Sequence, residues 1–286
     1  MIKIGTCGYS FRDWKGSVYP VKIKNSEILS YYNKELGFDL VEIDSTYYSF
    51  ISRRSIETMV DNTTDSFLFA AKCHRAITLN EMGKVRPSDI DNTAVFTGFL
   101  ESFAPMIESG KLLTFLAQFG PVFFKNRENV NYLLKLRKYF KDLPLTIEFR
   151  HKSWLSEEHR ESTFKLLREN NLSYAVVDEP CVRSLAPLVV EATTDLGYVR
   201  LHGRNKNWFD GGQGDRYDYF YTDEELSEFI PIARELEMRT RLTAIFFNNC
   251  HAGAALKNAI KLRQLLGITG LAARKKTNEQ MSLPLD

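Results

Sequence analysis

Short apolar stretches rich in β-branched and aromatic residues alternate along this chain with longer stretches of helical period. The short stretches predict strands at Ile2–Gly5, Leu40–Ile43, Leu68–Lys72, Leu113–Gln118, Leu145–Phe149, Tyr174–Asp178, Tyr198–His202 and Thr243–Asn248. The longer stretches predict helices over 26–36, 53–62, 88–107, 126–140, 156–170, 223–237 and 252–266. Strands that alternate with helices indicate βαβ units and a parallel sheet, and about eight such units favour closure into a barrel.

One unit departs from this alternation. Residues 179–197, between the sixth and seventh predicted strands, are expected to form a loop with at most a short helix. Residues 203–222 form a second long segment, with a glycine-rich stretch at 210–215. Since no Pro- or Ser-rich linker divides the chain, we predict an α/β fold with a single TIM-type (β/α) barrel over residues 1–268. Residues 269–286 are expected to form a flexible tail.

Polar side chains occupy alternate positions at the ends of several predicted strands. In Val41–Asp44, Ile147–Arg150 and Val199–His202, two apolar residues alternate with two polar or charged residues. Residues two apart share a face of a strand, and the covering helices require apolar partners. We therefore expect the aliphatic and aromatic residues to face the helices and the charged residues to face the barrel axis.

Further strand ends add polar side chains to the same expected chamber. They are Lys72 and His74, Gln118, Asp178 and Asn248, and the glycine-rich segment after the first strand adds Thr6 and Tyr9. In barrels of this kind the carboxyl ends of the strands and their loops form the active site. Burying an unpaired charge costs several kcal/mol, so the accumulation of charges predicts a functional polar mouth.

A purely structural interpretation remains open at this point. Internal ion pairs, such as Glu148 with Arg200 or Glu42 with Lys72, can close a barrel axis without any ligand. Asp44 can instead cap the loop that follows its strand.

The overall charge and the cysteines indicate which binding partners and which cellular compartment to expect. The net charge is +2, from 38 basic and 36 acidic residues, which does not favour a large nucleic-acid or membrane-binding surface. No secretion signal and no apolar run of membrane-spanning length is apparent. The four cysteines are scattered and form no Cys-x-x-Cys pair, which is typical of a reducing compartment, so we expect a cytoplasmic protein.

Several of these segments resemble the YecE-like domain-of-unknown-function family. The resemblance covers about residues 2–268 and is carried by Gly5–Ser10, Val41–Tyr48, Phe69–Lys72, Glu148–Trp154, Val199–Gly203 and Phe247–Asn249. It implies a barrel similar to those of the xylose-isomerase and endonuclease IV group, without an established reaction. This chain departs from the family pattern at two places. The family usually has Asn where this chain has Asp44, and it usually has Phe-Gln-Leu-Pro-Pro where this chain has Ala117–Pro121.

We expect an enzyme, a hydrolase, lyase or isomerase, that acts on a phosphorylated or sugar-like small molecule at this mouth. The candidates for acid/base catalysis are Glu42, Glu148, Asp178 and His202. The candidates for binding the substrate or its anionic group are Lys72, Arg150, Arg200, Gln118, Asn248, Tyr9 and Thr6.

Two alternatives stay open. In the first, the four acid/base candidates hold a divalent metal in a nuclease-like hydrolase; no other cofactor is predicted, because no dinucleotide fingerprint is found. In the second, the barrel is a non-catalytic protein that binds nucleic acid or another polyanion.

Overall fold

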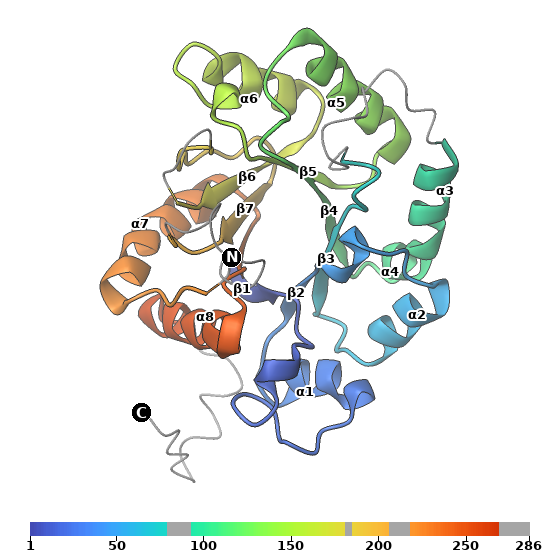
Figure 1. Ribbon diagram of the computed structural model, residues 1–286, viewed down its shortest axis with the longest axis vertical. Helices are drawn as coiled ribbons and strands as arrows, with labels where there is room; N and C mark the ends of the chain where they lie inside the picture. Colours follow the sequence, from blue (N-terminus) through green and yellow to red (C-terminus); the bar gives the residue numbers. More distant parts are fainter. Residues whose placement is uncertain (79–92, 181–184, 206–217, 269–286) are drawn as a thin grey trace.

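Eight parallel strands close into a barrel in which each strand pairs with its neighbours in the sequence and β8 pairs with β1 (Figure 1). This computed structural model describes residues 1–78, 93–180, 185–205 and 218–268. The strands are β1 (Ile2–Cys7), β2 (Leu40–Ile43), β3 (Leu68–Lys72), β4 (Leu112–Phe119), β5 (Leu145–Phe149), β6 (Ser173–Asp178), β7 (Leu196–Leu201) and β8 (Leu242–Phe247). The predicted TIM-type barrel is therefore confirmed, with strand boundaries that differ by a residue or two.

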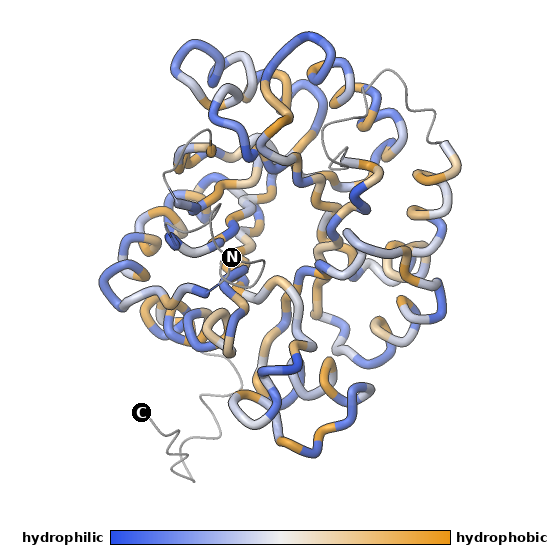
Figure 2. The backbone as a smooth tube through the Cα atoms, in the orientation of Figure 1, coloured by the Kyte–Doolittle hydropathy of each residue, from blue (hydrophilic) through white to orange (hydrophobic). Residues whose placement is uncertain are grey.

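Helices form a ring outside the strands (Figure 1). They are α1 (Ile28–Lys34), α2 (Arg53–Asp61), α3 (Thr93–Ser102), α4 (Ala104–Glu108), α5 (Arg127–Phe140), α6 (Arg160–Glu169), α7 (Asp223–Arg239) and α8 (Ala254–Leu265). Hydrophobic and hydrophilic positions alternate along them (Figure 2), as expected for helices that pack one face on a barrel. Among the helices of the described residues, none has the length and apolarity needed to cross a bilayer.

The prediction of one continuous helix over 88–107 is wrong, because the described part of this segment forms two helices. Within the described residues, α3 ends at Ser102 and α4 begins at Ala104, with Pro105 in its first turn. Proline has no amide hydrogen and its ring crowds the preceding turn, so it is tolerated at a helix start but not in a helix interior. Residues 88–92 of the prediction lie outside the described residues.

The irregular unit between the sixth and seventh strands is confirmed where the structure describes it. Residues 179–180 and 185–195 contain no helix. The glycine-rich stretch at 210–215 and the predicted tail at 269–286 lie outside the described residues.

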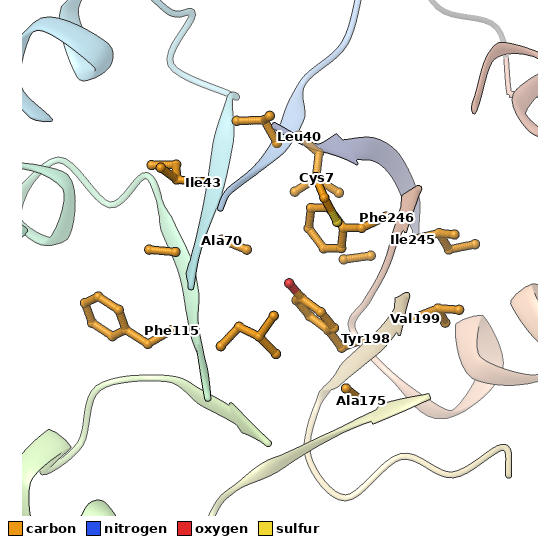
Figure 3. Close-up of a cluster of buried hydrophobic side chains, with 14 of the residues drawn as sticks. Cys7, Leu40, Ile43, Ala70, Phe115, Ala175, Tyr198, Val199, Ile245 and Phe246 are labelled. Atoms are coloured by element: carbon orange, nitrogen blue, oxygen red, sulfur yellow. The ribbon is translucent and has the colours of Figure 1, made fainter. Parts of the chain in front are cut away.

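The register of the strands determines which side chains face the barrel axis. Val177 pairs with Arg200, and Arg200 pairs with Phe246, so these three residues lie at one level on one face. In Figure 3, Tyr198 and Phe246 project into the barrel, whereas Val199 and Ile245 point toward the helices. The apolar residues predicted to face outward are buried, as expected for that layer: Val41, Ile43, Ile147, Phe149, Val199 and Leu201.

Candidate active site

The centre of the mouth is an ion-pair network built around Arg200 of β7. Its Nη1 atom donates to Glu148 Oε2 at 2.6 Å, and its Nη2 atom donates to Glu42 Oε1 at 2.7 Å. All three side chains are fully buried. Since Glu42 comes from β2 and Glu148 from β5, the guanidinium spans the barrel between two strands far apart in the sequence.

Further polar groups close the network around these carboxylates. Tyr198 donates to Glu42 Oε2 at 2.5 Å, and Gln118 donates to Glu148 Oε1 at 2.6 Å. Arg150 Nη1 donates to Glu148 Oε1 at 3.2 Å, while its Nη2 atom lies 2.8 Å from a carboxylate oxygen of Glu179. The buried charges are thus paired with one another, which is the condition for keeping them away from water.

His202 completes this closed part of the mouth. Its Nε2 atom lies 3.2 Å from Glu148 Oε1 and 2.9 Å from Arg150 Nη1, and its Nδ1 atom lies 2.8 Å from Asn248 Nδ2. Burial and the adjacent Arg150 lower the pKa of His202 to about 3, so the ring is neutral near pH 7. An amide nitrogen only donates, so Nδ1 accepts from Asn248 Nδ2.

The network drives the pKa values of its carboxyl groups apart. Burial raises the pKa of Glu42 to about 7, against the opposing effect of Arg200, and burial likewise raises that of Glu179 to about 7. Burial also acts to raise the pKa of Glu148, but Arg200, His202 and Arg150 hold it well below its usual value. Glu148 is therefore a fixed negative charge, whereas Glu42 and Glu179 can exchange a proton near neutral pH.

A cavity of about 350 Å³ opens beside this network, at the carboxyl ends of β1, β2, β3 and β8. Its lining includes Tyr9, Phe11, Asp44, Tyr48, Lys72 and Asn248. The turn that carries Tyr9 depends on Gly8. This residue has a φ of +83°, and a Cβ added to it would lie 2.8 Å from the Phe11 ring, so only glycine fits here. The cavity is largely aromatic and aliphatic, with a few convergent polar groups, which is typical of a small-molecule site.

Asp44 and Lys72 are the charged residues of this lining. Asp44 Oδ1 lies 3.6 Å from Lys72 Nζ and 3.6 Å from Arg200 Nη2, and the Asp44 side chain is 26% exposed. Burial acts to raise the pKa of Asp44, but Lys72 and Arg200 lower it below its usual value. Asp44 precedes the short 3₁₀ helix Ser45–Tyr47 and makes no side-chain capping bond, so the capping interpretation of this residue is wrong.

The predicted site residues divide into three groups. The first group forms the closed network and consists of Glu42, Glu148, Arg150, Arg200, Gln118 and His202. The predicted ion pair of Glu148 with Arg200 is present in it. Lys72 pairs with Asp44 and not, as predicted, with Glu42. Tyr9, Lys72 and Asn248 line the cavity.

Thr6 and Asp178 form the third group, which lies on the other face of the strands. Asp178 pairs in register with Leu201, an outward residue, and its carboxylate is held by Arg204 at 3.1 Å and Tyr221 at 2.6 Å. Thr6 pairs with Val41, and its hydroxyl lies 3.0 Å from that of Tyr32 on α1. The expectation that Asp178 faces the axis is therefore corrected.

Sequence reasoning placed Asp44 on the inner face but not among the catalytic or binding candidates, and it missed two further participants in the mouth. Tyr198, the partner of Glu42, lies two positions from the predicted inward residue Arg200, so the same alternation contained its signal. Glu179 follows the end of β6, where the alternation stops, and no sequence signal marks it as a partner of Arg150.

The four proposed metal ligands are not brought to one point. Asp178 is held on the outer face by Arg204, while Glu148 and His202 contact arginines on the inner face. In the part of the chain that the structure describes, the group of potential ligands close enough for one ion is Cys7, Glu42 and Asp44.

Several large apolar side chains are exposed in the connections that follow the strands. Of nine such side chains in the described residues, seven lie in loops that follow the carboxyl ends of strands: Val21, Tyr48, Phe50, Val122, Phe124, Leu188 and Phe220. Tyr48 also lines the cavity, and exposed apolar side chains beside a pocket are typical of a surface that binds something.

Comparison with known proteins agrees with the barrel and identifies the family. The profile of the family described as "Protein of unknown function DUF72" matches residues 3–282. The UPF0759 protein YunF of Bacillus subtilis (strain 168) is 33% identical over 285 residues, which cover 96% of this chain and 99% of the relative.

Solved structures give the same result. A DUF72 family protein from Thermotoga maritima MSB8 superposes with a TM-score of 0.84 at 40% identity, covering 93% of this chain and 99% of that one. A DUF72 family protein from Enterococcus faecalis V583 superposes with a TM-score of 0.83 at 29% identity, covering 94% and 96%. The resemblance inferred from the strand-end motifs is confirmed: this chain belongs to the DUF72 family, the YecE-like proteins of unknown function.

Proposed function

We propose that this protein is an enzyme that moves a proton on a small, hydroxylated, sugar-like carbonyl compound bound in the cavity. Asp44 is the base, and the Lys72 ammonium stabilises the negative charge that develops on the carbonyl oxygen. The observation that supports this proposal is the pair itself: a carboxylate and an ammonium 3.6 Å apart in the wall of one cavity.

An isomerase or a lyase fits this pair better than a glycoside hydrolase does. Hydrolysis of a glycoside requires two carboxyl groups about 5 to 9.5 Å apart on opposite sides of the scissile bond. Here the second carboxyl group near Asp44 is that of Glu42, which is fully buried and hydrogen-bonds to Asp44 itself. Two groups in direct contact leave no room for a bond between them.

Glu42 has a role behind the base in this proposal. Its pKa of about 7 lies near the pH at which a general acid or base works best, and its contact with Asp44 lets a proton pass between the two carboxyl groups. Glu42 can thus share the proton that Asp44 takes from the substrate, and the partly exposed Asp44 then exchanges that proton with solvent.

An uncharged ligand is favoured over a phosphorylated one. Of the three cations predicted to bind an anion, Arg150 and Arg200 are already bound to buried carboxylates, and Lys72 faces Asp44. Barrels often hold phosphate near the loop after the eighth strand, but here Ala252 in that loop donates its amide to Asp13 at 2.7 Å. A neutral ligand with hydroxyl groups avoids competition with these carboxylates.

The test follows the carbon-bound hydrogen of the substrate. Simple aldoses and ketoses that bind the protein by saturation-transfer NMR are incubated with it in D2O, and the loss of the C–H signal beside the carbonyl is followed. We expect wild-type protein to exchange this hydrogen and Asp44→Asn to lose exchange while retaining the fold. Sugars that bind without any Asp44-dependent exchange would contradict the proposed reaction.

The exposed aromatic residues around the mouth favour one other candidate, a non-catalytic protein that binds single-stranded nucleic acid by stacking. Binding of this kind weakens steeply with salt. Oligonucleotide binding that falls with salt and requires Tyr48 and Phe50, without any sugar binding, would favour this candidate.

A further inference from the structure

Three side chains of different chemistry converge beside the cavity in an arrangement suited to a divalent cation. Cys7 ends β1, Glu42 lies opposite it on β2, and Asp44 follows two positions later on the same face. Potential ligand atoms of the three lie within 4.8 Å of one another. Two donors on one zinc ion, each at about 2.0–2.3 Å, are separated by up to twice that distance, so small side-chain rotations are enough to bring these atoms to one ion.

A cation already lies among these donors, and it belongs to the protein. Arg200 Nη2 is 2.7 Å from Glu42 Oε1, 3.5 Å from Cys7 Sγ and 3.6 Å from Asp44 Oδ1. The Cys7 separation is ordinary for a hydrogen bond to sulfur, whereas the Asp44 separation is long for one to oxygen, and the buried Asp44 Oδ1 atom accepts no hydrogen bond. The three donors therefore surround a positive charge without all being satisfied by it.

We propose that the guanidinium of Arg200 occupies a divalent-cation site formed by Cys7, Glu42 and Asp44. The native protein needs no metal ion at this point because Arg200 supplies the charge through a covalently attached group. Removing the guanidinium exposes the site, which then takes a borderline-soft cation such as Zn²⁺ or Co²⁺, since one ligand is a thiol and two are carboxylates. Binding forms a metal–thiolate bond and releases the Cys7 proton to solvent.

This cation site is independent of the proposed reaction, because it concerns only which group supplies the positive charge among Cys7, Glu42 and Asp44. It also differs from the metal site predicted from the sequence, which lacked Cys7 and Asp44 and included Asp178 on the other face. Burial raises the pKa of Cys7 well above its usual value, so the free thiol stays protonated until a metal displaces its proton.

The experiment uses Co²⁺, whose thiolate complexes absorb in the near ultraviolet, and compares wild type with Arg200→Met. We expect the variant to bind one equivalent with a thiolate–Co²⁺ band and about 100-fold or more tighter than wild type. Adding Cys7→Ser to Arg200→Met should abolish the band. Adding Cys250→Ser, a neighbouring buried thiol outside the ligand group, should leave it in place.

Loss of Arg200 leaves Glu148 without its closest cation, which can destabilise the fold. A second variant, Arg200→Met with Glu148→Gln, removes this uncompensated charge and serves as the folding control. If Arg200→Met folds only with Zn²⁺ and the Cys7→Ser form does not, the site is supported. If neither folded variant shows a Cys7-dependent band, or if wild type binds Co²⁺ through Cys7 as tightly as the variants, the proposal is wrong.

Discussion

The mouth of this barrel has two parts that use the same residue types in opposite ways. The closed part is centred on β5 and β7 and reaches Glu42 of β2 through Arg200; there Glu148, Arg150 and Arg200 are buried and each contacts an opposite charge. In the open part, over β1, β2, β3 and β8, the ion pair of Asp44 with Lys72 lines a cavity.

The difference distinguishes charged side chains that stabilise the fold from charged side chains that can act on a ligand. A fully buried ion pair is held by its partners, and removing one partner strands the other in a medium that solvates it poorly. A charge at a cavity wall keeps access to water and to a ligand, so its removal costs less stability and more function. Measurements of both quantities on the two parts can break or sharpen this comparison.

The largest effect on stability is expected from Glu148→Ala in the closed part. The change leaves Arg150 and Arg200 without a shared carboxylate, and we expect the free energy of unfolding to fall by about 3–5 kcal/mol. Urea denaturation measures it. The matched control is Glu157→Ala at an exposed position, expected to change stability by less than about 0.5 kcal/mol. Similar losses in both variants would remove the basis for calling the network structural.

The next effect is a pH-dependent difference between wild type and Glu42→Gln. In the folded protein the pKa of Glu42 is about 7, above its ordinary value near 4.5. The folded state therefore retains a proton that the unfolded state loses, and this stabilisation is complete below about pH 4.5 and lost as the pH rises through 7. The shift corresponds to about 3 kcal/mol.

Glutamine mimics the protonated side chain at every pH, so it isolates this contribution from those of other groups. We expect the stability of Glu42→Gln, relative to wild type, to rise by up to about 3 kcal/mol between pH 5 and pH 8. Denaturation curves at the two pH values measure it. A relative stability that stays constant or falls would show that Glu42 is ionised throughout in the folded state.

Asp44→Asn in the open part is expected to change stability by about 1 kcal/mol or less, because the side chain is partly exposed and its ion pairs are long. Its effect on the proposed proton exchange should be a loss of about 10²- to 10⁴-fold. Calorimetry and exchange in D2O give the two numbers. A large stability loss with unchanged exchange would reverse the assignment of the two parts.

The smallest effect on stability is expected from Tyr48→Ala, within about 0.5 kcal/mol, because this side chain is 66% exposed. Tyr48 nevertheless lines the cavity, so sugar affinity measured by titration should fall. Met238→Ala, also highly exposed but at the end of α7, is the control and should leave affinity unchanged. Equal affinity in both variants would exclude Tyr48 from the binding surface.

The sequence by itself determined the barrel and the polarity of its mouth. Alternating strands and helices predict a closed parallel sheet, and the two-residue period at Glu42, Glu148 and Arg200 predicts that these charges share the inner face. These features follow from local patterns, because each strand must hide its apolar face under a helix.

Only the tertiary structure decided which charges are buried together and which reach the cavity. Arg200 meets Glu42 and Glu148 across separations of 158 and 52 residues, and nothing local in the chain specifies this meeting. The same period placed Asp178 on the inner face, whereas its register opposite Leu201 places it outside. Alternation fixes a side chain's face only relative to its own strand; the face that becomes the interior depends on pairing with neighbouring strands, which forms when the barrel closes.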